Sequence, residues 1–177
     1  MNIIFRTSDT LFANMRRDLE RQHAFAFERV GFLSVKAAST DASLVLLAQD
    51  YYPVADEDYI DDPSVGAMMG QEAIRKALNI ALLNSVGVFH VHLHELPGNG
   101  RHWFSAVDLR EQLKFVPDFF KVCSKMPHGA LVLSPRSAAG RVWLAPKRIE
   151  PITEFNILGS KLQIVRAASD GSTSYYG

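Results

Sequence analysis

The chain has 177 residues, of which 47% are hydrophobic and 21% are charged, a balance typical of soluble globular proteins. Nineteen basic and nineteen acidic residues give a formal net charge of zero, which argues against nucleic acid or an anionic membrane as a partner. The single cysteine excludes an intrachain disulfide and favours a reducing compartment. No apolar run is long enough to span a bilayer.

We therefore expect a cytoplasmic protein with one domain over residues 1–168, followed by a flexible C-terminal tail over residues 169–177. The first half of this domain alternates strands and helices. A short strand at 2–6 precedes a helix that begins at the N-cap oxygens of Thr7–Asp9 and ends near Gln22. Further strands are expected at 27–35 and 43–52. Glu28 stands in the mainly apolar run of the first of these strands, where an unpaired carboxylate would be costly to bury. A salt bridge with Arg29, an edge position or a functional role would explain it.

An acidic segment, residues 55–62, lies between proline residues and is expected to be a solvated surface loop. A docking surface for a basic partner is the alternative. The helix predicted at 71–83 has an apolar stripe with small alanines beside it. The stripe consists of Ile74, Leu78 and Leu82, and the alanines are Ala77 and Ala81.

The second half of the chain begins with an apolar strand that carries three histidines. A helix follows at 105–125, in which Pro117 should cause a kink or a break. Strands are then expected at 128–134, 141–144, 149–158 and 161–165, with a turn at 135–140. Cys123 is expected in the core, and His102 and His128 are expected to be structural or to face solvent.

The strand histidines His90, His92 and His94 alternate with apolar residues, so all three should point to one face. Imidazole is the commonest protein ligand for metals, and two imidazoles at this spacing can reach one ion. Turn residues follow, and Asp108 then falls in the first turn of the next helix. Two histidines and one aspartate leave a fourth position for water, which is the layout of a catalytic zinc site. Ser105-x-x-Asp108 is also a capping-box pattern, and the two interpretations are compatible.

The combination of His92-x-His94 and Ser105-x-x-Asp108 resembles the JAMM signature of the JAB/MPN metalloproteases. Glu28, followed by Gly31-Phe32-Leu33, resembles the upstream glutamate of that family. Ten residues separate His94 from Ser105, where the family signature has seven, and we interpret the difference as a longer loop. His90 with His92 is the fallback ligand pair.

The resemblance implies an α/β fold of the α+β type, in which helices flank a curved mixed β-sheet, as in the cytidine-deaminase-like JAB/MPN fold. It implies a zinc ion held by His92, His94 and Asp108. Glu28 would act as general base and acid, and Ser105 would stabilise the oxyanion.

The implied activity is that of a zinc metalloprotease or isopeptidase that hydrolyses the amide bond at the C-terminus of a ubiquitin-like protein. Its partners would be a ubiquitin-like protein or its conjugates, and the activating and conjugating enzymes of the same pathway. A non-catalytic MPN-type interaction module and a processing protease for a sulfur-carrier protein are the alternatives.

Overall fold

The computed structural model of the protein describes residues 1–94, 103–134, 137–167 and 173–175. His102 and the rest of the segment 95–102 lie outside the described residues, as do 135–136 of the expected turn. Of the expected tail, Thr173–Tyr175 form a strand, whereas 169–172 and 176–177 lie outside the described residues.

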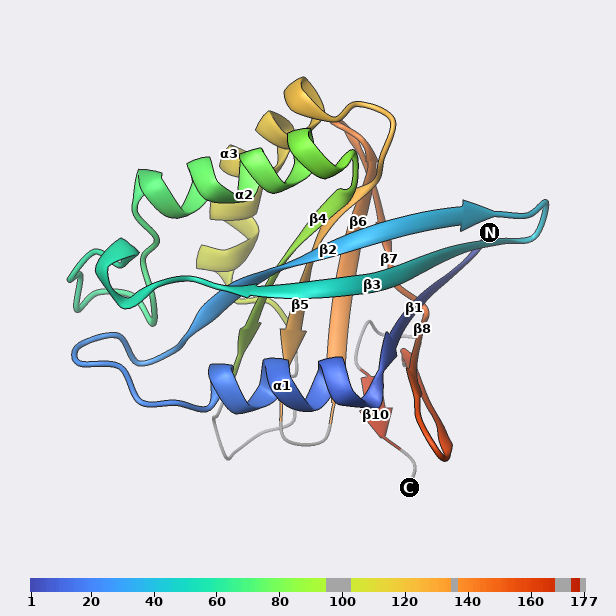
Figure 1. Ribbon diagram of the computed structural model, residues 1–177, viewed down its shortest axis with the longest axis horizontal. Coiled ribbons are helices and arrows are strands. Elements are labelled where there is room, and N and C mark those ends of the chain that lie inside the picture. The colour runs from blue at the N-terminus through green and yellow to red at the C-terminus, as the bar shows by residue number, and fades with distance from the viewer. Residues whose placement is uncertain (95–102, 135–136, 168–172, 176–177) are drawn as a thin grey trace.

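The described residues form a single ten-stranded mixed sheet in the order β10-β9-β8-β1-β3-β2-β4-β5-β6-β7 (Figure 1). The strands are β1 Asn2–Ser8, β2 Val30–Ser39, β3 Ser43–Pro53, β4 Gly87–Leu93, β5 His128–Leu133, β6 Ala138–Ala145, β7 Arg148–Pro151, β8 Glu154–Leu158, β9 Leu162–Ala167 and β10 Thr173–Tyr175. β6 also approaches β9 and β10 from the opposite end of the sheet. The sheet is therefore strongly curled, and the predicted α+β class with helices flanking a curved mixed sheet is confirmed.

Helices cover both faces of this sheet (Figure 1). α1 (Asp9–Leu19) packs on one face, where Met15 and Leu19 join the largest apolar cluster. α2 (Gln71–Asn84) and α3 (Ala106–Val122) pack on the other face. None of these three helices in the described chain combines the length and apolarity that a membrane crossing requires.

β4 lies in the middle of the sheet, antiparallel to β2 and parallel to β5. Its odd-numbered residues Phe89, Val91 and Leu93 enter the cluster beneath α1. Side chains alternate along a strand, so His90 and His92 point to the face covered by α2 and α3. The three-histidine pattern therefore places imidazoles on the helix-pair side of the sheet.

α2 buries a different stripe from the one that the sequence predicts. Ala73, Ala77 and Ala81 are buried, whereas Leu82 is 52% exposed. The small alanine side chains let the helix backbone approach the sheet closely, and this contact decides the orientation. Ile74 and Leu78 lie at the margin of the same cluster.

Of the kink or break predicted at Pro117, the break is wrong, because α3 continues through this proline to Val122. Proline removes only one helical hydrogen bond, the one to the carbonyl of Leu113. Leu113 is exposed, so water can take the place of the missing donor.

Several predicted strand boundaries also change. β6 begins at Ala138, inside the turn expected at 135–140. β2 begins at Val30, so Glu28 precedes the strand and does not stand inside it. The run 149–158 divides into β7 and β8, which pair with different strands.

The acidic segment contains a short 3₁₀ helix, η1 (Asp56–Asp58), in which Asp58 is buried and forms a salt bridge with Lys76 at 2.6 Å. The expectation of a fully solvated loop is therefore wrong for this residue.

Candidate metal centre

The candidate ligands come from three parts of the chain that the sheet brings together. His92 is the penultimate residue of β4, which is buried along its whole length, and His94 follows the strand directly. In the antiparallel pairing of β2 with β4, Val30 stands opposite His92. Just beyond this last pair, Glu28 precedes β2 and His94 follows β4, so the two residues lie at the same end of the paired strands. The strand pairing thus explains why residues 28 and 94 meet.

Asp108 reaches the same place from the N-terminus of α3. The Ser105 hydroxyl accepts a hydrogen bond from the Asp108 backbone N–H at 3.1 Å, and the Asp108 Oδ2 accepts one from the Ser105 N–H at 2.7 Å. This is the reciprocal capping box that the sequence pattern allows. Capping therefore orients the Asp108 carboxylate and leaves it facing the histidines.

Three potential ligand atoms form a compact triangle. His92 Nε2 lies 3.0 Å from His94 Nε2, and Asp108 Oδ2 lies 3.4 Å from the first and 3.5 Å from the second. Zinc bonds of about 2.0–2.1 Å in tetrahedral geometry place neighbouring ligand atoms about 3.3 Å apart. The separations in the triangle are therefore close to those of ligand atoms that share one metal ion.

Glu28 stands beside this triangle. Its Oε1 lies 3.8 Å from His94 Nε2, and ligand atoms of Glu28, His92 and His94 lie within 4.8 Å of one another. These three residues are a group that could hold a metal ion. The carboxylate of Glu28 is thus close enough to serve as a further ligand or as a base next to the ion.

The contacts described above shift the pKa values of Asp108 and His94. Burial alone would raise the pKa of Asp108, but hydrogen bonds from His92 and His94 outweigh it and hold that pKa far below its ordinary value. The same bond to Asp108 raises the pKa of His94, and the negative charge of Glu28 adds to the effect. Asp108 is therefore a carboxylate at neutral pH, as metal ligation demands.

Two residues that sequence reasoning did not assign hold Glu28 in place. The carbonyl of Gly66 accepts hydrogen bonds from the N–H groups of Phe27 and Glu28, at 2.8 and 3.1 Å. A Cβ at residue 66 would stand only 2.8 Å from the Glu28 carboxyl group, so only glycine fits without displacing it. No pattern around Gly66 indicates this contact, because it joins two distant loops.

Arg29, the second of these residues, is only 2% exposed. Its guanidinium donates to the carbonyls of Arg21 and Gln22 and forms a salt bridge with Asp56 at 2.7 Å. The sequence suggested Glu28 as the salt-bridge partner of Arg29, whereas the structure shows a salt bridge of Arg29 with Asp56. A basic residue in an apolar run next to Glu28 was the available signal for this anchoring role.

His90, the fallback ligand, lies outside the group that could hold an ion. It is buried, and burial lowers its pKa to about 3. Neither ring nitrogen has a hydrogen-bond partner among the described residues. The geometry therefore favours His92 with His94 as the ligand pair.

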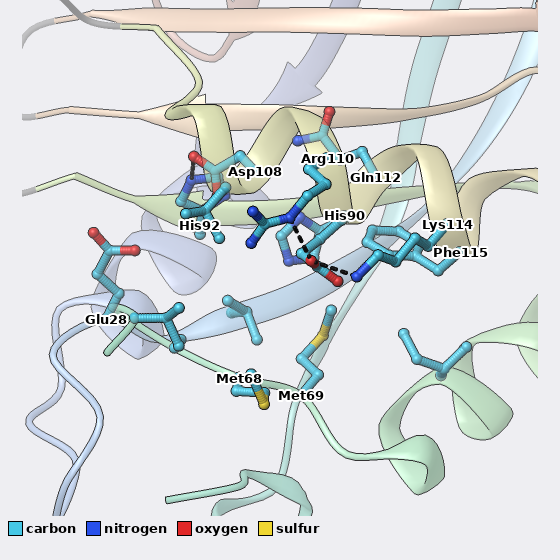
Figure 2. Close-up of a pocket in the computed structure, with 16 residues that line it drawn as sticks. Glu28, Met68, Met69, His90, His92, Asp108, Arg110, Gln112, Lys114 and Phe115 are labelled. Atoms are coloured by element: carbon cyan, nitrogen blue, oxygen red, sulfur yellow. Dashed lines mark hydrogen bonds and ion pairs between the residues drawn. The ribbon is translucent and has the colours of Figure 1, made fainter. Parts of the chain in front are cut away.

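A cavity of about 210 Å³ opens beside the metal centre, and His90 is part of its wall (Figure 2). Glu28, His92 and Asp108 line one end of it. The other lining residues come from β2, the segment before α2, α2 itself and α3; they include Val30, Val65, Ala67, Met68, Met69, Ile74, Arg110, Glu111, Lys114 and Phe115. The sequence did not indicate this cavity.

Comparisons with known proteins leave the family open. No protein-family model and no curated protein matches the chain. A solved structure of the STIL N-terminal domain from Trichoplax adhaerens aligns with 92% of this chain at 8% sequence identity, with a TM-score of 0.39. The alignment spans 44% of that structure, and a likeness of this degree supports no conclusion about function.

Proposed function

We propose that the protein is a zinc-dependent metalloprotease that hydrolyses the amide bond at the C-terminus of a ubiquitin-like protein. The observation that supports this proposal is the triangle of His92 Nε2, His94 Nε2 and Asp108 Oδ2, with the Glu28 carboxylate beside it. Three protein ligands with a neighbouring carboxylate are typical of hydrolytic zinc sites.

The chain's own residues have separate roles in the proposed reaction. A bound zinc ion would supply Lewis acidity and lower the pKa of a water molecule to about 7. Glu28 accepts the proton of the attacking water and passes it to the leaving amine. The Ser105 hydroxyl accepts a bond from Asp108 N–H and keeps its own hydrogen, which it donates to the developing oxyanion.

The fold family, the compartment and the partners of the protein are parts of the same proposal. The curled sheet with helices on both faces would be a variant of the JAB/MPN fold, with the centre at the end of β4. The protein would act in the cytoplasm on a ubiquitin-like protein or its conjugates, together with the enzymes that activate and conjugate that protein. The order of Glu28, the histidine pair and Ser105-x-x-Asp108 along the chain supports these assignments.

The test combines metal analysis with a cleavage assay. Ubiquitin carrying an aminocoumarin amide at its C-terminus is one substrate, and a sulfur-carrier protein fused through its C-terminus to a reporter is the other. We expect one equivalent of zinc in the wild type, and cleavage of one of the two substrates.

Glu28→Gln keeps the size of the side chain and removes the base. It should retain zinc and lose cleavage by about 10²–10⁴-fold. The exposed Glu57 provides a matched control, and Glu57→Gln should change neither property. Full activity of Glu28→Gln, or a wild type that binds no zinc, would overturn the proposal.

A further inference from the structure

The cavity next to the metal centre is mainly apolar and has room for one large side chain. Its volume of about 210 Å³ is roughly that of seven water molecules in the liquid. Met68 and Met69 form one wall, and Phe115 lies across from them on α3 (Figure 2). Methionine packs adaptably and makes favourable contacts with aromatic rings, so these walls suit a planar aromatic group.

Two of the charged lining residues, Glu28 and Asp108, belong to the metal centre, and the other three lie at the rim of the cavity. Glu111 Oε1 is 3.2 Å from Arg110 Nε and 2.8 Å from Lys114 Nζ, and all three side chains are more than 40% exposed. Away from the metal centre and the rim, none of the described lining residues is acidic or basic except His90. A charged side chain in that part of the cavity would lose its hydration without gaining an ion-pair partner.

Two buried polar residues of the lining, His90 and Gln112, have side-chain polar atoms without a hydrogen-bond partner among the described residues. The Gln112 amide points away from the cavity (Figure 2), whereas His90 stands on its inner wall. It is 6% exposed, and both of its ring nitrogens lack a hydrogen-bond partner among the described residues. Its ring packs edge to face with Phe32 and Phe115, at centroid distances of 5.7 and 5.5 Å. A buried polar group without a partner is costly and calls for an explanation. A neutral imidazole can donate from one nitrogen and accept at the other.

We propose that this cavity recognises a tyrosine side chain of the substrate next to the amide that is cleaved. The aromatic ring fills the space between Phe115 and the two methionines, and a modest rotation of the His90 ring brings a nitrogen to the phenol hydroxyl. A tyrosine combines an apolar body with a polar tip, whereas a leucine or phenylalanine would leave His90 unpaired. The position next to the cleaved bond rests on the proposed function, because Glu28, His92 and Asp108 line the same cavity.

The cavity can be tested without metal or activity. p-Cresol and toluene, which differ by the hydroxyl, are titrated into the EDTA-treated full chain while the methyl resonances of Met68 and Met69 are followed by NMR. We expect both resonances to shift and p-cresol to bind about 5–10-fold more tightly, the effect of one additional hydrogen bond. Absence of binding, or equal affinity of the two probes, would overturn the assignment.

Two variants test which residues are responsible for probe binding and for the preference for p-cresol. His90→Phe preserves a ring of similar size and should remove the preference for p-cresol while toluene still binds. Ala67→Leu fills the cavity and should abolish binding of both probes. Ala42 is exposed in the turn between β2 and β3, and Ala42→Leu is the matched control that should bind as the wild type does. A preference for p-cresol that persists in His90→Phe would contradict the role of His90.

A separate arm tests whether the cavity serves the metal centre. In the zinc-loaded protein, tyrosine hydroxamate should bind at least about tenfold more tightly than glycine hydroxamate, since its side chain buries apolar surface. Equal affinities would overturn the placement next to the cleaved bond. Failure of zinc binding alone would instead refute the proposed function and leave the p-cresol result intact.

Discussion

The neighbouring parallel strands β4 and β5 both carry histidines, and the two sets are in opposite situations. His128, at the start of β5, accepts a hydrogen bond from the Val88 N–H at Nδ1, and its Nε2 lies 2.9 Å from the Cys123 carbonyl. His92 and His94, at the end of β4, point their Nε2 atoms at each other and at Asp108. The backbone satisfies the first histidine, whereas the second pair faces other side chains.

This difference shows what separates a structural histidine from a candidate ligand on one sheet. A carbonyl can only accept, so the contact with Cys123 requires the proton on Nε2 and leaves Nδ1 as the acceptor for Val88. His128 is therefore held as one neutral tautomer. Among the described residues, the contacts of the β4 pair at Nε2 are with side chains and not with the backbone, so these two nitrogens remain available to an ion.

The sharpest way to test the comparison is to remove one histidine from each set. His94→Ala should lower zinc affinity by more than about 100-fold, because loss of a ligand exceeds the known effect of losing an outer hydrogen-bond partner. His128→Ala should retain the wild-type zinc stoichiometry. Zinc titration with a competing chelator measures both, and equal losses in the two variants would contradict the distinction.

Stability should show the reverse order. His128→Ala leaves the Val88 N–H and the Cys123 carbonyl unpaired and removes a ring that stacks on Phe119 at 5.3 Å. We expect the free energy of unfolding to fall by about 3 kcal/mol. Urea unfolding in EDTA measures this, and in the same medium His94→Ala should unfold close to the wild type.

The pH dependence of stability sharpens the same contrast. Burial lowers the pKa of His128 in the folded protein to about 4, against about 6.5 in the unfolded chain. Its contribution is therefore fully present above pH 6.5 and is lost as the pH falls toward 4. Between pH 7 and 5 the loss should be about 2 kcal/mol.

His128→Gln isolates this contribution, because a glutamine does not titrate. Urea unfolding at both pH values in EDTA should show a smaller decline for the variant than for the wild type. Identical declines would mean that His128 is not held neutral in the fold.

The smallest expected effect concerns the cap that orients Asp108. Ser105→Ala removes the hydroxyl that accepts the Asp108 N–H and should lower the free energy of unfolding by about 1 kcal/mol. Ser160, an exposed serine after β8, gives the control Ser160→Ala, which should be neutral. No difference between the two variants in thermal unfolding would rule out a stabilising cap.

The metal triangle was accessible to sequence reasoning because its parts follow local rules. Alternation along the strand predicts that His92 and His94 point to the same face of the sheet, and the capping pattern puts Asp108 in the first turn of α3. Glu28 was identified, but its place before β2 depends on the loop around Gly66, which no local periodicity describes.

Long-range packing explains the remaining differences between the predicted and the observed structure. In α2, the stripe of Ile74 and Leu78 and the stripe of Ala73 and Ala77 have the same helical spacing, so periodicity alone could not choose between them. The cavity escaped prediction for a related reason. It forms only where the segment of Met68 and Met69 meets α3, and nothing in either segment specifies the other.

The pairing of β2 with β4 has a consequence for biosynthesis. Glu28 and His94 become neighbours only after the intervening chain has left the ribosome and both strands have joined the sheet. A growing polypeptide that displays one of them without the other holds an incomplete centre. In the proposed enzyme, the capacity to cut other proteins would thus appear only after synthesis has passed Asp108 and β2 has paired with β4.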